Sequence, residues 1–433
     1  MSTLSKNPQP FATVPPSAQK SIRREFVCSL NFLLCVLGYP LTMALASPFT
    51  NNLETGENVY FTYPYRIFQM AVALAAFIAV LRNPIPKFSW KLFLLAVFWV
   101  FFSARAFWSL FIDPPLSEYG NLWYYRCYFV IDSFPLLAVL KGWNDINFGK
   151  VLRWALLLGF FGLVFSSQSI SMQAEASWTG EIGRAAASRM MHTQALGHFS
   201  AAIILLSAYM FFAEKKNLFW KIFSVFAALL GFYVMLKAGS RGPLLAVAFA
   251  GTLWFGIKRK NILGIVFLWA LCIAFLVLFQ EQIVELIRTV SPTMAYRLTT
   301  TLDGGDTSGR DVLWTTCWEE CKRNPLFGYS YTAFGYPHNM FLDGVMMFGM
   351  LGGWIITILI FVGIFSSLKF LHKSCADYWW VLLLLASLSQ AWTQSGFSAL
   401  AIQAPLLLLF IRENMRNSTT PILNPSFPQK NKF

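Results

Sequence analysis

Residues 194–260, QALGHFSAAIILLSAYMFFAEKKNLFWKIFSVFAALLGFYVMLKAGSRGPLLAVAFAGTLWFGIKRK, contain three apolar runs that decide the fold. Each run approaches the length of about 20 residues that a helix needs to cross a lipid bilayer. Backbone polar groups inside lipid must be bonded within their own segment, so helices are expected. The stretch therefore predicts three membrane-spanning helices, at 194–213, 218–236 and 243–257.

The rest of the chain repeats this pattern. Of its 433 residues, 56% are hydrophobic and 12% are charged, whereas a soluble domain carries about 25% charged residues. This composition leaves too little polar surface for a water-soluble protein and predicts an all-α, polytopic membrane bundle of about 12 helices. The other predicted spans lie near 28–47, 67–81, 92–112, 122–140, 151–167, 262–280, 339–366, 378–393 and 397–411.

The distribution of basic residues sets the orientation and argues against a nucleic-acid partner. The net charge is +14, but the lysines and arginines concentrate in alternate loops, as the positive-inside rule requires of cytoplasmic loops. Both termini are therefore predicted in the cytoplasm. The basic loops contain Lys6, Lys20, Arg23 and Arg24; Arg82, Lys87 and Lys91; Lys141, Lys150 and Arg153; Lys215, Lys216 and Lys221; Lys258, Arg259 and Lys260; Lys369 and Lys373; and Arg412, Arg416, Lys430 and Lys432.

Five segments follow from these assignments. Residues 1–25 are polar and contain Pro and Ser, which predicts a disordered cytoplasmic tail. Residues 26–280 form a first transmembrane bundle of about nine helices. Residues 281–337 form a long segment with amphipathic helices on the outer side, 338–412 form the last transmembrane helices, and 413–433 form a second cytoplasmic tail.

Three segments on the outer side carry arginines against the charge rule. They are 168–193, the turn 237–243 and the long segment 281–337. All three face the same side of the membrane, so we expect them to converge over the bundle. In the first of them, Arg184 and Arg189 have two readings: either side chain reaches a diphosphate, or both are solvated loop charges.

The second segment contains Ser240-Arg241-Gly242-Pro243 between two apolar helices. A charge at that depth costs a few kcal/mol and is usually functional or paired. Gly242 permits close approach of a ligand, and Pro243 suits the first turn of a helix whose amides face an anion. The pattern favours a phosphate cradle; the alternative is that the Arg241 guanidinium reaches to the lipid headgroups.

The third segment ends in Tyr336-Pro337-His338-Asn339, at the start of an apolar helix. The positive end of a helix dipole disfavours protonation of an imidazole, and a neutral imidazole is what a general base requires. The alternative for His338 is a capping or core histidine. Asn339 bonds His338, bonds a substrate, or caps the helix.

The long segment has internal structure. Residues 281–290 predict an amphipathic helix, and a turn at Arg310 predicts a second helix that ends at Asn324. Cys317 and Cys321 lie at helical spacing, where a disulfide would be strained, so free thiols are favoured. The spacing of Cys and His residues suggests no metal site, and no cofactor is expected.

Four motifs, in this order, resemble the bacterial O-antigen ligase and O-antigen polymerase family of integral membrane glycosyltransferases. The resemblance covers roughly residues 180–355. The motifs are Gly183-Arg184; Ser240-Arg241-Gly242; Ser308-Gly309-Arg310 with Trp314 and Asn324-Pro325-Leu326-Phe327-Gly328-Tyr329; and Pro337-His338-Asn339 running into Phe348-Gly349 and Gly352.

The resemblance implies a GT-C-like fold in the bacterial inner membrane and a site on the periplasmic face. The donor would be a glycan on undecaprenyl diphosphate, and the reaction would be inverting and independent of metal ions. His338 would take the proton of the acceptor hydroxyl. Arg241 and Arg184 would hold the diphosphate, with Arg189 and Arg310 in reserve; Ser240, Gly242 and Asn339 would line the site.

The resemblance leaves the acceptor open. It would be lipid A–core in a ligase, which the arrangement of His338 favours, or another lipid-linked repeat in a polymerase. A flippase or transporter of lipid-linked oligosaccharides is an alternative of another class. Transporters often contain internal repeats and charges near the midplane of the membrane, whereas the unexpected charges here gather at one face.

Overall fold

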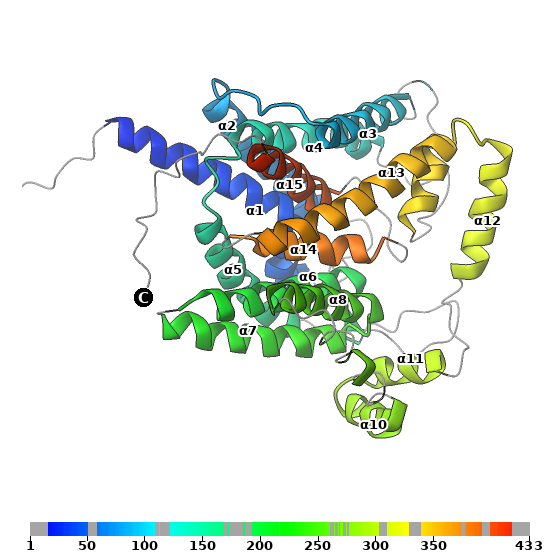
Figure 1. Ribbon diagram of the computed structural model, residues 1–433. Coiled ribbons are helices and arrows are strands. Elements are labelled where there is room, and N and C mark those ends of the chain that lie inside the picture. Colours follow the sequence, from blue (N-terminus) through cyan, green and yellow to red (C-terminus); the bar gives the residue numbers. More distant parts are fainter. Residues whose placement is uncertain are drawn as a thin grey trace, which may run out of the picture.

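The computed structural model is almost entirely helical (Figure 1). This confirms the all-α class, with one short antiparallel pair of strands, β1 (Ser171–Met172) and β2 (Ala185–Ala186). The structure describes residues 16–50, 59–108, 112, 122–168, 171–172, 185–186, 193–215, 217–259, 264, 267, 269–271, 274, 277–302, 310–328, 339–373, 377–391 and 399–417.

Helices cover the predicted apolar runs. In the first part of the chain they are α1 (Pro16–Thr50), α2 (Val59–Val80), α3 (Trp90–Phe107), α4 (Leu122–Gly142), α5 (Phe148–Gln168), α6 (Thr193–Ala213), α7 (Leu218–Lys237) and α8 (Arg241–Arg259). In the second part they are α10 (Gln280–Val290), α11 (Pro292–Leu302), α12 (Arg310–Arg323), α13 (Met340–Lys373), α14 (Trp379–Ser389) and α15 (Leu400–Asn417).

Six helices within the described ranges are long and apolar enough to cross a membrane. They lie in α1, α2, α5, α6, α7 and α13, which supports a polytopic membrane bundle. The structure describes the predicted run 262–280 only in part, so the count of about 12 spans stays a prediction.

The first helix starts earlier than the sequence predicts. α1 begins at Pro16, so the helix includes residues assigned to a disordered tail. Two ion pairs hold α1, at Arg24 and Glu25, against the α4–α5 connection and the first turn of α5. Arg24 Nε lies 3.0 Å from Asp145 Oδ1, and Lys150 Nζ lies 2.7 Å from Glu25 Oε1.

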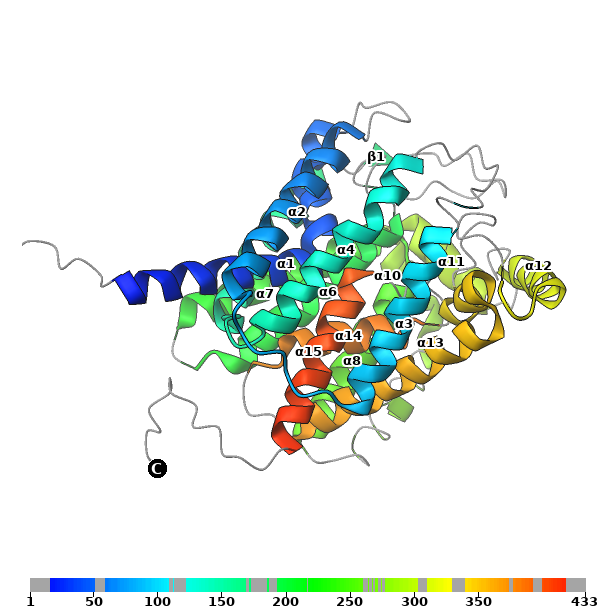
Figure 2. The same ribbon diagram turned by 90° about the horizontal axis from the view of Figure 1, so that it is seen from above.

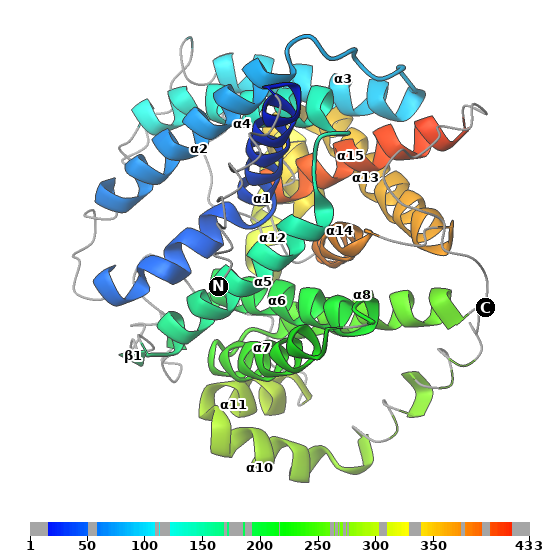
Figure 3. The same cartoon turned by 90° about the vertical axis from the view of Figure 1, so that its left-hand side faces the viewer.

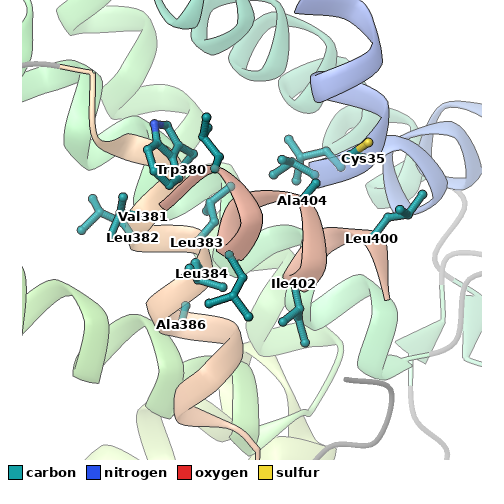
Figure 4. Packing of buried hydrophobic residues seen from close by; sticks show 14 of the residues in the cluster. Cys35, Trp380, Val381, Leu382, Leu383, Leu384, Ala386, Leu400, Ile402 and Ala404 are labelled. Atoms are coloured by element: carbon teal, nitrogen blue, oxygen red, sulfur yellow. The ribbon is translucent and has the colours of Figure 1, made fainter. Parts of the chain in front are cut away.

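The core is built around α14, the shortest apolar helix near the centre of the bundle (Figure 3). Nine of its 11 residues are buried, including Trp379 and Trp380. α14 packs against α6, α8, α13 and α15, and Figure 4 shows α14, with Trp380 and Ala386 labelled, beside the first turns of α15, with Ile402 and Ala404 labelled. A helix that is apolar on all sides is stable only when other protein surrounds it.

The helices of the long segment lie at the edges of the bundle. α10 and α11 form a pair beside α7, and α12 lies against the outer end of α13 (Figure 1). The amphipathic helix predicted at 281–290 is therefore found as α10, and the second predicted helix is found as α12. The sequence analysis missed α11.

Helix α13 is broken at Gly349, which corrects the prediction of one continuous run at 339–366. Gly349 has φ 72° and ψ −174°, a combination that essentially only glycine adopts. The segment 340–348 folds back on 350–373: a Cβ on Gly344 would lie 3.1 Å from Gly353 Cα. The two arms are visible in Figures 1 and 2. Such an interrupted helix is tolerated in a membrane where other protein covers it.

The turn after α12 holds this break in place. The Met350 amide donates to the Pro325 carbonyl at 2.8 Å. Gly328, with φ 65°, approaches so closely that a Cβ on it would lie 2.8 Å from the Gly349 amide nitrogen. The spaced glycines and the Asn-Pro turn are therefore explained by direct backbone-to-backbone contact between the two segments.

An apolar cavity of about 670 Å³ lies between α3 and α4. Leu95, Trp99, Phe134 and Leu137 line it, together with Leu407 of α15. Cavities of this size take hydrocarbon-sized ligands. Lys91 of α3 also forms an ion pair with α15: its Nζ lies 2.7 Å from Glu413 Oε2.

We expect Gly349→Ala to destabilise the protein by about 1–3 kcal/mol, because alanine does not fit this backbone conformation. A Cβ would also collide with the Leu326 carbonyl. Thermal unfolding of the detergent-solubilised protein measures the effect. Gly251→Ala in α8 is the matched control, since no atom lies within 4 Å of its Cβ position. Equal unfolding temperatures for the two variants would contradict the break.

Candidate functional site

The turn between α7 and α8 places Arg241 at the start of a helix. Gly239 has φ 63° and follows the C-cap of α7, where its amide donates to the Leu236 carbonyl at 3.0 Å. A glycine in this left-handed conformation is a common helix terminator. Arg241 then opens α8 and is half-buried. Its backbone amide lies at the positive end of the helix dipole, which attracts anions.

Helix α6 supports this turn from the side. A Cβ on Gly197 would lie 2.9 Å from Pro243 Cγ and 3.2 Å from Ser240 Cβ. Gly197 therefore lets the turn seat directly on α6. Ser240 is buried in this contact, with an exposed fraction of 8%.

The end of α14 lies on the other side of the turn. Gln390 is the C-cap residue of α14 and is buried. A Cβ on Gly242 would lie 3.5 Å from Gln390 Oε1, an ordinary van der Waals distance. The Gln390 carboxamide therefore lies close to Gly242, in the first turn of α8.

The same end of α14 holds the start of α13. The Met340 amide donates to the Ala391 carbonyl at 2.7 Å. Asn339 Oδ1 accepts from the amides of Phe341 and Leu342 at 3.0 and 3.1 Å, so its side chain caps α13. Of the three roles considered for Asn339, the structure shows capping.

Residues 390–391 thus contact both the Ser240-Arg241-Gly242 turn and the helix start that follows Asn339. The first turn of α8, with Arg241 and Gly242, and the first turn of α13, with Asn339, meet at the end of α14. The other predicted site residues lie outside the described part: His338, Arg184 and Arg189 belong to undescribed stretches, and Arg310 begins α12 without a described side chain.

Sequence analysis missed Gln390. It lies near the end of the apolar run predicted at 378–393 and belongs to no recognised motif. One signal was available, because an uncharged polar residue inside a predicted span often lies at a functional or packing site. Within the described ranges, no group of three His, Cys, Asp or Glu side chains is close enough to hold a metal ion.

The two cysteines of α12 are free thiols buried against α13. They pack with Val345 and Met346. Burial raises the pKa of both thiols, helped by the charge of Asp343 at Cys317; the pKa of Cys321 rises to about 11, with smaller contributions from Cys317 and Glu320. The reactive thiolate is therefore scarce at neutral pH.

We expect Cys317 and Cys321 to resist alkylation by N-ethylmaleimide at pH 7 in the folded protein and to react after denaturation. Mass spectrometry of the peptide that contains both residues measures the modification. A disulfide between them, or rapid labelling in the folded state, would contradict the buried free thiols.

Asn339→Ala should lower the free energy of unfolding by about 1 kcal/mol, because two amides at the start of α13 lose their cap. Asn339→Ser retains a capping oxygen and should recover most of the stability. Thermal unfolding of the three proteins measures this. A stability of Asn339→Ala equal to that of the wild type would show that the cap contributes nothing.

Comparison with known families gives one match. Residues 226–357 match the family model described as O-antigen ligase. The matched segment runs from the middle of α7 into the second arm of α13, so it contains Arg241, Asn339 and the break at Gly349, whereas Gln390 lies beyond it. No curated protein gave a significant match.

Proposed function

We propose that the chain, whose residues 226–357 match the O-antigen ligase family, transfers a glycan from undecaprenyl diphosphate to lipid A–core. The reaction would take place at the periplasmic face of the bacterial inner membrane, with both termini in the cytoplasm. It inverts the anomeric carbon and uses no metal ion. The substrates are lipids, so a membrane-embedded site gives both of them access by lateral diffusion.

In the proposed mechanism, His338 removes the proton from the acceptor hydroxyl. The acceptor oxygen attacks the anomeric carbon of the donor as the bond from that carbon to the diphosphate oxygen breaks. Undecaprenyl diphosphate leaves with the electron pair and gains negative charge. Arg241 stabilises this charge with two parallel hydrogen bonds from its planar guanidinium, and Arg184 or Arg189 completes the clamp.

One observation carries this proposal: residues 390–391 contact the start of both α8 and α13. Arg241 is the first residue of α8, and His338 is the residue before Asn339, the cap of α13. The N-terminus of α8 favours a diphosphate there, whereas the first amides of α13 are already bonded to Ala391 and Asn339. His338 directly precedes Asn339 in the sequence, which supports a proposed base close to the proposed phosphate ligand.

Reconstitution tests the function. Purified protein is mixed with an undecaprenyl-diphosphate glycan and lipid A–core in the presence of EDTA, and the products are separated on a gel. We expect transfer to the core lipid. Lengthening of the lipid-linked glycan without core transfer would instead indicate a polymerase, and absence of both products from a folded preparation would favour the flippase or transporter.

We expect His338→Ala to abolish transfer and Arg241→Lys to lower kcat by about 10²–10³-fold, because lysine cannot replace a bidentate clamp. Rates are measured in the reconstituted assay on preparations with equal expression and thermal stability. Gly251→Ala, on the same helix as Arg241, is the control and should retain full activity. Normal transfer by His338→Ala would refute the assignment of the base.

A further inference from the structure

We propose that Gln390 is a positioning residue that sets the placement of the Arg241 turn relative to the start of α13. The proposal rests on the proposed function, because it concerns the geometry of that site. It assigns Gln390 no direct part in bond making or breaking.

The position of Gln390 is set by a rigid element. It ends α14, whose residues from Trp379 to Ala386 are all buried. The Trp379 indole also donates to the Phe148 carbonyl of α5 at 3.1 Å. This hydrogen bond attaches the start of α14 to α5. Functional groups on packed helices are held in position more accurately than those on loops. The packing of α14 therefore fixes the position of Gln390 at its end.

Two contacts transmit this position to the site. The Gln390 carboxamide lies against Gly242, beside Arg241, with 3.5 Å between its Oε1 and the Cβ position of Gly242. The next residue, Ala391, accepts the hydrogen bond from the Met340 amide at 2.7 Å. One dipeptide therefore contacts the first turn of α8 through its side chain and the first turn of α13 through its backbone.

The chemistry of the residue suits this place. The carbonyl end of α14 carries partial negative charge, and the amide ends of α8 and α13 carry partial positive charge, so the three termini attract one another. A carboxamide adds hydrogen-bonding capacity without adding charge. A carboxylate there would place a negative charge against the first turn of α8 and repel a diphosphate, whereas a thioether would fill the space without a strong hydrogen bond.

The functional consequence concerns distance. A shift of about 1 Å in the relative position of catalytic groups costs up to about 10²-fold in rate, even when the change lies outside the reacting atoms. The end of α14 spaces the two helix starts, so Gln390 governs the separation of the Arg241 turn from the start of α13.

The first test replaces Gln390 by methionine, which keeps the length of the side chain. We expect kcat of the reconstituted transfer to fall about 10–100-fold, as for other supporting residues, with unchanged membrane insertion. Gln403→Met on α15 is the matched control, because Gln403 is equally buried but bonds Trp99 at 3.2 Å, away from the turn. Full activity of Gln390→Met, with unchanged KM for both substrates, would overturn the proposal.

Gln390→Glu provides a readout that a purely structural role would not change. The new carboxylate places a negative charge against the first turn of α8, so we expect a higher KM for the donor, an unchanged KM for the acceptor and partial recovery of activity as the pH falls and the carboxyl becomes neutral. A pH profile identical to that of the wild type would contradict the position of Gln390 beside the diphosphate.

A double-mutant cycle with Arg241→Lys decides whether Gln390 acts through the Arg241 turn. We expect the double variant to lose less activity than the product of the two single losses, because both changes disturb one contact. Multiplicative losses would show independent effects and overturn the proposal. Failure of the wild type to transfer any glycan would refute the proposed function itself. If the wild type is active and the Gln390 variants transfer glycan as fast as the wild type, only this inference is refuted.

Discussion

The hydrogen bond from the Met340 amide to the Ala391 carbonyl connects the core of this protein to its candidate site. On one side of the bond is α14, an apolar helix enclosed by α6, α8, α13 and α15. On the other side is the N-terminus of α13, which the Asn339 side chain caps. Because Gln390 also lies against Gly242, the buried helix brings two distant parts of the sequence together. The scaffold therefore sets the geometry of the site by packing, with few polar contacts.

The broken helix is the second part of this arrangement. A straight α13 would carry its N-terminus past the outer end of the bundle, whereas the turn at Gly349 reverses the first arm so that Met340 reaches the end of α14. The cost of the unusual backbone is offset by the contact with the turn at Pro325 and Gly328. The outer helix α12 contributes by burying Cys317 and Cys321 against the same arm. The long outer segment thus stabilises the break near the site.

Much of this structure was predictable from sequence because lipid imposes simple rules. Apolar run length predicted both ends of α4, α5, α6, α7 and α8 within one turn, and the spacing of 281–290 predicted α10. The reversal at Gly349 was not predicted, because hydropathy does not distinguish a straight span from two arms that fold back. The ion pairs of α1 at Arg24 and Glu25 join residues more than 100 positions apart, which a local pattern cannot reveal. Arg241 and Asn339 were found by their motifs, whereas Gln390 has no motif and is recognised only from its neighbours in space.

The measurement that tests the account most directly is a structure of the protein with a non-transferable, diphosphate-linked glycan lipid. The account predicts that the diphosphate lies at the start of α8 within hydrogen-bonding distance of Arg241. It also predicts that the His338 imidazole faces the anomeric carbon from the side where the acceptor enters. A diphosphate bound away from α8, or Arg241 and His338 on opposite sides of the bundle, would contradict it.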